Sequence, residues 1–362
     1  MKKSLIALAT LAAATGAFAQ SSVTLFGGAD LNYRSVTSGA NKFQGMAQDG
    51  IYSSRFGVMG TEDLGGGLKA NFHFEGGMNP DTGTSGGFNF TRKSTIGISG
   101  GFGEVRLGRD YTPVFTIAGI ADPFGTNGIG SSYNLANSLT VAPGTPAEVA
   151  SAGGFESATG VLSDTNAFRA NNSFAYYSPS FSGVSAAVMY GLGSENTGTT
   201  NRGAGKMTSI KLQYANGPVV AAIGTQSTKG STETAKWATT FLAGSYNLGV
   251  AKISAGLKTD KLTDTAGISS NALKSTILGV SAPMGATTLR ASYVTRKVAS
   301  AKIGNQLAFG AIYDLSKRTS VYGTYSALKN EADFGNAVGA VAVSDFTGLK
   351  SKGFEFGVKH SF

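Results

Sequence analysis

Few side chains in this sequence are of the types that carry out chemistry. There is no Cys, and the only His residues are His73 and His360. His73 stands two residues before Glu75, so with one of the many Ser residues it could act as the base of a hydrolytic triad. A solvated histidine is the commoner alternative and the one we favour. His360 alternates in phase with the apolar residues of its segment, which places it at an apolar boundary.

Motifs for other chemistries are also missing from the sequence. It contains no H-E-x-x-H, no metal-ligand spacing and no P-loop. Asp333-Phe334-Gly335 is a chance likeness to the kinase motif without its context. The formal charge is +9, but the Lys and Arg residues are dispersed rather than gathered in a patch for nucleic acid. We therefore expect no enzyme, no metal or other cofactor, and no nucleic-acid partner.

Composition limits the elements that could position any site. Gly accounts for 52 of 362 residues, and charged residues for only 14%. That much Gly disfavours a helical bundle, because each Gly inside a helix costs about 1 kcal/mol relative to Ala. No segment beyond the N-terminus has the 18 or more apolar residues that a spanning helix needs. Aromatic residues make up 10% and are spread along the chain, which argues against disorder and leaves a large all-β protein.

The N-terminus has the pattern of a secretory signal peptide over residues 1–19. A basic start at Lys2 and Lys3 precedes an apolar run, which ends in Ala17-Phe18-Ala19. We predict cleavage after Ala19, with residues 20–362 forming the exported domain beyond the cytoplasmic membrane.

Hydropathy alternates with a period of two in several segments, which indicates strands of a sheet with two unlike faces. At the end of the sequence, Phe354, Phe356, Val358 and Phe362 share one phase, and polar residues occupy the other. Residues 68–75 and 23–32 alternate in the same way. A soluble sandwich, with the apolar face as its core, would also alternate and remains an alternative at this point.

The connections between predicted strands favour a membrane barrel instead. Short, turn-forming stretches lie at 63–67, 100–103, 178–183, 216–218, 247–249, 283–286 and 315–318. Between them lie long polar stretches at 34–52, 80–90, 111–168, 192–206, 227–235, 259–274, 296–304 and 329–351. Strict alternation of seven short and eight long connections predicts sixteen antiparallel strands in a transmembrane β-barrel. A barrel of that size leaves a water-filled lumen.

Several motifs resemble those of the Gram-negative trimeric general porins, closest to their basic, anion-selective branch. They are S-V-T-L-F-G at 22–27, G-T-E-D-L-G-G-G-L-K at 60–69, F-G-E-V-R-L-G-R at 102–109 and G-V-K-H-S-F at 357–362. The resemblance spans the exported chain. It implies a homotrimer of sixteen-stranded barrels, each with a pore that is narrowed by an inward-folded third extracellular loop, here residues 111–168.

The resemblance also implies which residues line the constriction. Asp122 begins D-P-F-G, which is similar to the acidic tip of the family's inward loop. Arg55, Arg92 and Arg169 match its basic wall cluster in local context, and Glu75 matches a carboxylate that pairs with the cluster. Alternation points Arg55 inward, but it favours Lys93 over Arg92 unless a bulge near Ser94 intervenes, so both are candidates.

These features predict an outer-membrane porin for passive diffusion of small hydrophilic solutes and ions, with modest anion preference. A substrate-specific channel for phosphate or organic acids is the main alternative, and a non-conducting barrel serving as enzyme, adhesin or anchor is the third. The resemblance further implies that Phe362 is read by the barrel assembly machinery. The remaining expected partners are the other subunits of the trimer, outer-membrane lipid and lipopolysaccharide, and small anions and solutes in transit.

Overall fold

The computed structural model describes residues 21–84, 89–136, 168–193, 203–230, 234–263, 267–331, 334–339 and 348–362. The predicted signal peptide, residues 1–19, lies outside this range. None of the helices in the described residues is long and apolar enough to cross a bilayer.

The first strands are β1 (Ser22–Ser38), β2 (Asn41–Gln48), β3 (Arg55–Gly65), β4 (Leu68–Gly77), β5 (Lys93–Gly100), β6 (Gly103–Tyr111), β7 (Arg169–Tyr177) and β8 (Val184–Gly191). The others are β9 (Met207–Asn216), β10 (Val219–Lys229), β11 (Lys236–Asn247), β12 (Lys252–Thr263), β13 (Leu273–Met284), β14 (Thr287–Val298), β15 (Ala301–Asp314), β16 (Thr319–Asn330) and β17 (Lys350–Ser361). Three short helical segments, η1 (Phe115–Ile117), α2 (Ala118–Ala121) and α3 (Tyr133–Ala136), lie between β6 and β7.

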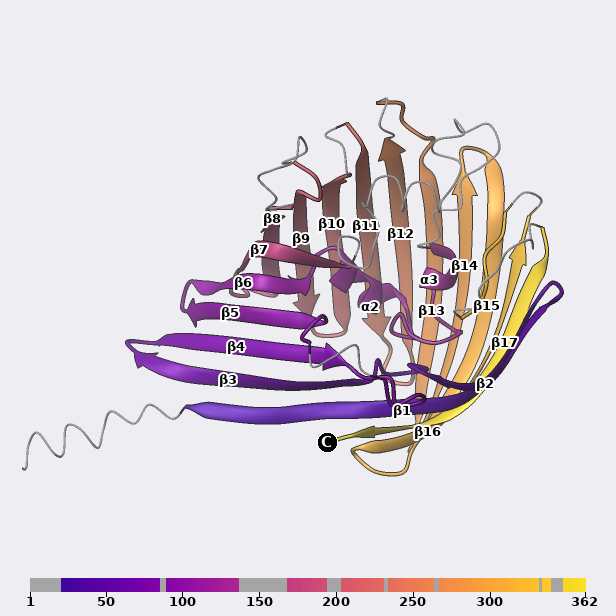
Figure 1. Cartoon of the computed structure of the whole chain (residues 1–362), viewed down its shortest axis with the longest axis horizontal. Helices are drawn as coiled ribbons and strands as arrows, with labels where there is room; N and C mark the ends of the chain where they lie inside the picture. Colours follow the sequence, from indigo (N-terminus) through magenta and orange to yellow (C-terminus); the bar gives the residue numbers. More distant parts are fainter. Residues whose placement is uncertain are drawn as a thin grey trace, which may run out of the picture.

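All strands belong to one antiparallel sheet that closes on itself (Figure 1). Each strand pairs with its neighbours in sequence, except that β2 and β3 both pair with β1, and β1 also pairs with β17 from Gly28↔Ser361 to Ser38↔Ser351. Closure leaves no unpaired edge, which a sheet within lipid requires. The fold is therefore a closed β-barrel, as the alternation of connections predicts.

The seventeen strand segments occupy sixteen positions, because β2 and β3 together form one interrupted strand. The second half of β1 pairs with β2 and its first half with β3. Asp30 of β1 supports the interruption, since its Oδ2 accepts hydrogen bonds from the backbone N–H groups of Ile51 (2.7 Å) and Tyr52 (2.8 Å). The hydroxyl of Tyr322 donates to Oδ1 of the same carboxylate.

All seven predicted short turns fall between consecutive strands. Two predicted long loops are wrong. In place of a loop at 34–52, β1 continues to Ser38 and β2 begins at Asn41; in place of one at 296–304, only two residues separate β14 from β15. In both stretches the outward positions include Lys residues and the inward positions include buried apolar residues such as Val36 and Val298, so the pattern of the lipid-facing wall is lost although backbone pairing continues.

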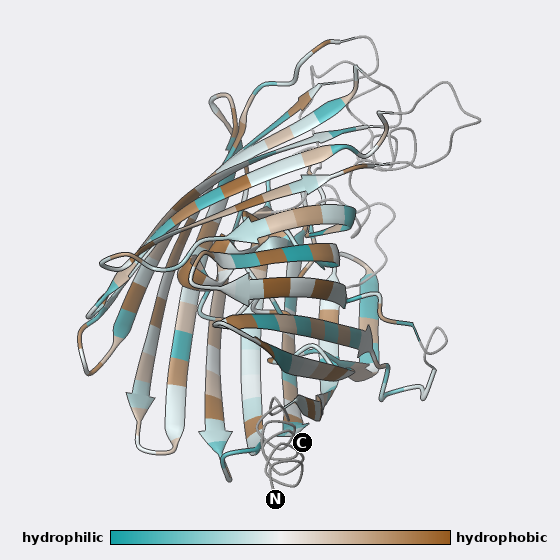
Figure 2. Ribbon diagram, turned by 90° about the vertical axis from the view of Figure 1, so that its left-hand side faces the viewer, coloured by the Kyte–Doolittle hydropathy of each residue, from teal (hydrophilic) through white to brown (hydrophobic). Residues whose placement is uncertain are grey.

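Hydrophilic and hydrophobic residues follow one another along the strands of the wall (Figure 2), and the two kinds lie on opposite faces. Apolar side chains such as Leu257 and Phe356 are 54% and 56% exposed on the outer face. Their sequence neighbours Lys258 and Glu355 point to the other side and are almost completely buried. The outer face is therefore the lipid-facing one, and the inner face carries the polar groups.

Residues 112–136, here called the inner segment, lie against the inner face of the wall with their helical turns between β10 and β15, and Figure 1 shows α2 and α3 within the outline of the sheet. Their apolar side chains form a buried cluster with inward residues of the wall. It includes Ile117, Ala118, Ala121, Leu135, Phe241, Leu262, Ile277 and Val294. Two wall glycines permit this approach, because a Cβ on Gly256 would lie 2.7 Å from the Cβ of Ala121, and one on Gly279 would lie 2.6 Å from the Cδ of Pro123.

Candidate functional site

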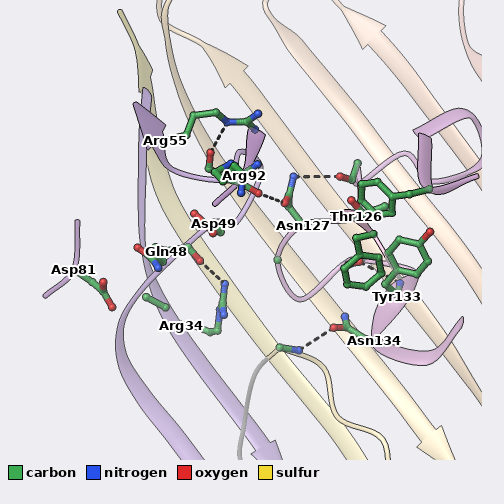
Figure 3. Close-up of a pocket in the computed structure, with 18 of the residues that line it drawn as sticks. Arg34, Gln48, Asp49, Arg55, Asp81, Arg92, Thr126, Asn127, Tyr133 and Asn134 are labelled. Carbon is green, nitrogen blue, oxygen red and sulfur yellow. Dashed lines mark hydrogen bonds between the residues drawn. The ribbon is translucent and has the colours of Figure 1, made fainter. Parts of the chain in front are cut away.

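A cavity of about 830 Å³ separates the wall at β1–β3 from residues 125–134. Its lining includes four arginines, Arg34, Arg55, Arg92 and Arg169, and two aspartates, Asp49 and Asp81. Figure 3 shows Arg34, Arg55 and Arg92 on one side of the cavity, with Thr126, Asn127, Tyr133 and Asn134 on the other.

Glu75 lies between two of the predicted arginines. Nε of Arg92 is 2.7 Å from Glu75 Oε1, and Nη1 of Arg55 is 3.4 Å from the same oxygen. The Glu75 residue is only 4% exposed, whereas both guanidinium groups line the cavity. The carboxylate therefore holds the two cations in position from behind, while the cations face the water-filled side.

Arg92 and Lys93 both lie on the inner face. Strand β5 begins at Lys93, so Arg92 stands before the strand, where alternation does not apply. The register shift of this region is in β6, between Gly108 and Asp110, rather than near Ser94. Arg92 reaches the main cavity, and Lys93 lines a second cavity of about 210 Å³.

The second cavity has balanced charge. Nζ of Lys93 is 3.3 Å from Asp110 Oδ2, and Arg106 pairs with both Asp110 and Glu104. The guanidinium of Arg106 also lies 4.6 Å above the centre of the Tyr177 ring. Because each cation here has a carboxylate partner, this cavity contributes less to net charge than the arginine-lined one.

Tyr111 joins two of the arginines. Its hydroxyl oxygen accepts a hydrogen bond from Arg92 Nη2 and another from Arg169 Nη2, each at 2.7 Å. Arg169 also stacks over the Tyr111 ring at 4.4 Å. The ring itself stacks on Phe115 at 5.1 Å, so the start of the inner segment fixes both guanidinium groups.

Asp122 does not line the cavity. It is 3% exposed, and its two oxygens accept hydrogen bonds from the backbone N–H groups of Phe124 and Ser132, both at 2.8 Å. Burial raises the pKa of the Asp122 carboxyl, although these N–H donors oppose the rise. In this position Asp122 fixes the turn at the tip of the segment instead of presenting charge to the lumen.

Sequence reasoning missed Arg34, because it assigned this residue to a loop. In the structure Arg34 points inward from β1, and its Nε donates to Glu355 Oε2 at 3.0 Å. Glu355 is 2% exposed and lies behind Arg34, as Glu75 lies behind Arg55 and Arg92. Recognising that the strand continues to Ser38 would have placed Arg34 correctly by parity.

Buried cations of the wall bind carbonyl groups of the inner segment, and these too were missed. Lys258 Nζ lies 3.3 Å from the carbonyl oxygen of Ala136, which also accepts from Arg296. Arg290 Nη1 lies 3.3 Å from the Pro123 carbonyl oxygen. All three cations have inward parity, so alternation could have identified them as wall residues.

Phe362 extends the pairing of β17 with β1, the two strands that close the barrel. It exchanges two backbone hydrogen bonds of 3.0 Å with Gly27, and its ring is half-exposed on the outer face.

Within the described residues, no group of three His, Asp or Glu side chains is arranged to hold a metal ion.

Comparisons with known proteins identify relatives of the whole chain. A family model described as Gram-negative porin matches residues 4–333. Outer membrane porin protein 32 of Delftia acidovorans is 39% identical, and an outer membrane porin protein of Bordetella pertussis is 29% identical, each over the full length of both chains. The solved anion-selective porin from Comamonas acidovorans aligns with a TM-score of 0.80 at 34% identity, covering 94% of this chain and all of that one. OmpT of Vibrio cholerae, at 14% identity and a TM-score of 0.62, covers 94% of this chain and 98% of its own and shares the fold.

Proposed function

The chain belongs to the family of Gram-negative porins and is an outer-membrane channel, not an enzyme; from this premise we propose that small hydrophilic solutes diffuse through it passively, with a modest preference for anions. The anion preference follows the description of the Comamonas acidovorans relative as anion-selective. The arrangement of charge around the cavity supports the same preference in this chain.

One observation carries the proposal, namely that the cations line the cavity and carboxylates lie behind them. Arg34, Arg55, Arg92 and Arg169 line it, while Glu75 and Glu355 are buried against the wall. A permeating ion therefore meets guanidinium groups first. In a water-like dielectric, a unit charge about 5 Å away changes the energy of an ion by about 0.8 kcal/mol before salt screening. Asp49 and Asp81 in the same lining oppose this effect, so the preference is modest.

Further parts of the proposal concern maturation and assembly. We propose that residues 1–19 are removed on export, that residues 111–168 form the constriction loop, and that three subunits form the native assembly. OmpT of Vibrio cholerae, an outer membrane protein that shares the fold, has a trimer form among solved structures. We also propose contact with outer-membrane lipid and lipopolysaccharide, and recognition of Phe362 by the barrel assembly machinery.

Zero-current potentials across planar bilayers in a KCl gradient test the selectivity. The wild type should prefer chloride, and Arg55→Gln, Arg92→Gln and Arg169→Gln should each reduce that preference. Arg318→Gln is the matched control, because it removes one guanidinium from a turn outside the cavity lining. A wild-type channel that prefers potassium would overturn the proposal, and saturable block by phosphate or an organic acid would favour a substrate-specific channel instead.

A further inference from the structure

Four aromatic rings line the arginine-containing cavity next to one another. They are Tyr111, Phe115, Tyr133 and Phe168, and we call them the ring cluster. The centroid of the Phe115 ring lies 5.1 Å from that of Tyr111 and 5.8 Å from that of Tyr133. The Phe168 ring lies 5.0 Å from Phe115 and 5.5 Å from Tyr133. The four rings therefore form one continuous aromatic surface at the lumen.

Passive diffusion of hydrophilic solutes does not require such a surface. The lumen wall of a barrel of this kind is polar, and aromatic area in contact with water costs free energy. Tyr133 and Phe168 pack against the buried apolar cluster of the inner segment, yet every member of the ring cluster keeps part of its surface exposed. Partly exposed aromatic side chains in a concave site, with a few charged groups beside them, are typical of ligand-binding sites.

The ring cluster adjoins the arginines through Tyr111. The guanidinium of Arg169 stacks over the Tyr111 ring at 4.4 Å and donates to its hydroxyl oxygen. Arg55 and Arg92 share Glu75, whereas Arg169 is paired with no carboxylate in the part of the chain that the structure describes. Its Nε is buried there without a hydrogen-bond partner. A cation without a counter-charge and an aromatic surface therefore meet at one point of the cavity.

The charges around the ring cluster favour an anionic aromatic ligand over a cationic one. Lys258 points from β12 toward the cluster, and its Nζ lies 5.9 Å from the centre of the Tyr133 ring. Figure 3 shows Asp49 and Asp81 across the cavity from Tyr133. A cationic ligand on the rings would be repelled by Arg169 and Lys258, whereas the same two charges attract an anion.

We propose that this part of the cavity binds aromatic carboxylates as they pass through the pore. The carboxylate accepts hydrogen bonds from Arg169, and the ring of the solute packs on Phe115 and Tyr133. An aliphatic acid would use only the guanidinium, and a neutral aromatic compound only the rings, so the combination selects solutes that carry both groups. The proposal rests on the proposed function as an anion-preferring channel and adds a class of solute to it.

Block of the single-channel chloride current in planar bilayers tests the proposal, with benzoate, acetate and benzamide as the probes. Benzoate should block the wild type at about tenfold lower concentration than acetate, because only benzoate pairs with the rings. Benzamide has the ring without the charge and should block no better than acetate. The readout is the ratio of the half-blocking concentrations of acetate and benzoate within each variant, so a change that weakens carboxylate binding alone cancels.

Phe115→Leu is the test variant, since it keeps an apolar side chain but removes the central ring. It should lower the ratio about fivefold, and Phe115→Tyr, which restores a ring, should keep the wild-type ratio. Phe43→Leu is the matched control, because Phe43 of β2 lines the same cavity but lies outside the ring cluster. Its ratio should equal that of the wild type.

Saturation-transfer NMR of benzoate with the full-length protein in detergent measures binding without conduction. The ring protons should be saturated by the wild type and much less by Phe115→Leu. Equal block by benzoate and acetate would overturn the proposal, as would an unchanged ratio in Phe115→Leu or an equal loss in Phe43→Leu. Block by benzamide equal to that by benzoate would overturn the role of Arg169.

The two proposals fail in distinguishable ways. A wild-type channel that prefers potassium, but whose benzoate signal in the NMR experiment depends on Phe115, would refute the anion preference and leave the aromatic site standing. A channel that prefers chloride but does not distinguish benzoate from acetate would refute the aromatic site and leave the anion preference standing.

Discussion

Replacing Glu75 by Gln is the most informative single change to the arginine cluster. The substitution removes one negative charge behind Arg55 and Arg92 while keeping an oxygen that can accept from Arg92 at 2.7 Å. Both guanidinium groups keep their places at the cavity, but neither has its carboxylate. We therefore expect the channel to become more anion-selective, in contrast to every arginine substitution.

The expected size follows from Coulomb's law. For an ion about 8 Å from the removed charge in a water-like dielectric, the energy changes by about 0.5 kcal/mol, and screening at 0.1 M salt reduces this to about 0.2 kcal/mol. The change has opposite sign for chloride and potassium, so their permeability ratio should rise about twofold. Stability should fall by about 1–2 kcal/mol, less than for a fully buried pair, because the Arg55 and Arg92 side chains are 21% and 14% exposed.

Zero-current potentials at two salt concentrations measure the ratio, and thermal unfolding in detergent measures the loss of stability. Glu62→Gln, at a turn outside the cavity, is the control for a change of net charge alone. The reasoning is refuted if the ratio is unchanged or shifts toward potassium in Glu75→Gln, or if Glu62→Gln gives the same shift.

Three further substitutions test the inner segment. Tyr111→Phe removes the oxygen shared by Arg92 and Arg169, and should lower chloride preference and increase current noise as the two side chains lose their fixed positions; unchanged single-channel records would contradict this role. Gly279→Val places a side chain where Pro123 lies, so the segment must move into the lumen and single-channel conductance should fall; an unaltered conductance would show that the contact is not tight. Asp122→Ala removes two hydrogen bonds of 2.8 Å and should destabilise the tip of the segment by about 1–3 kcal/mol, observed as faster proteolysis of that segment in the folded barrel; wild-type protease resistance would argue against a stabilising role for this carboxylate.

Much of the barrel could be predicted from local patterns, because the lipid-facing positions must be apolar and the turns need residues such as Gly, Pro and Asn. The last strand, β17, shows this most clearly, with Phe354, Phe356 and Val358 on one face. The pattern failed over 34–52, where the outward positions Lys42 and Gln44 are polar and the inward positions include the apolar Val36 and Phe43. Backbone pairing alone defines β2 there, and hydropathy does not report it.

The site was predictable only where a residue lies inside a regular strand. Parity places Arg55 on the inner face, and the structure brings it to the cavity. Arg92 precedes its strand, so its direction depends on Glu75 and Tyr111 rather than on alternation. The burial of Asp122 depends on a hydrogen bond from Ser132, ten residues away, which no local pattern encodes. Asp122 lies outside the cavity lining, and the role of Phe362 in assembly stays a prediction.

The pairing of β1 with β17 also sets a condition on biogenesis. The strands that seal the cylinder are the first and the last along the chain, so their contact has a sequence separation of more than three hundred residues. Contacts of such high order form late, because the whole intervening chain must be ordered before they do. A nascent chain lacking residues 350–362 would expose the free hydrogen-bonding edges of both β1 and β16. Sealing must therefore follow complete synthesis and export, and until then the chain depends on other proteins to keep those two edges from joining a neighbouring molecule.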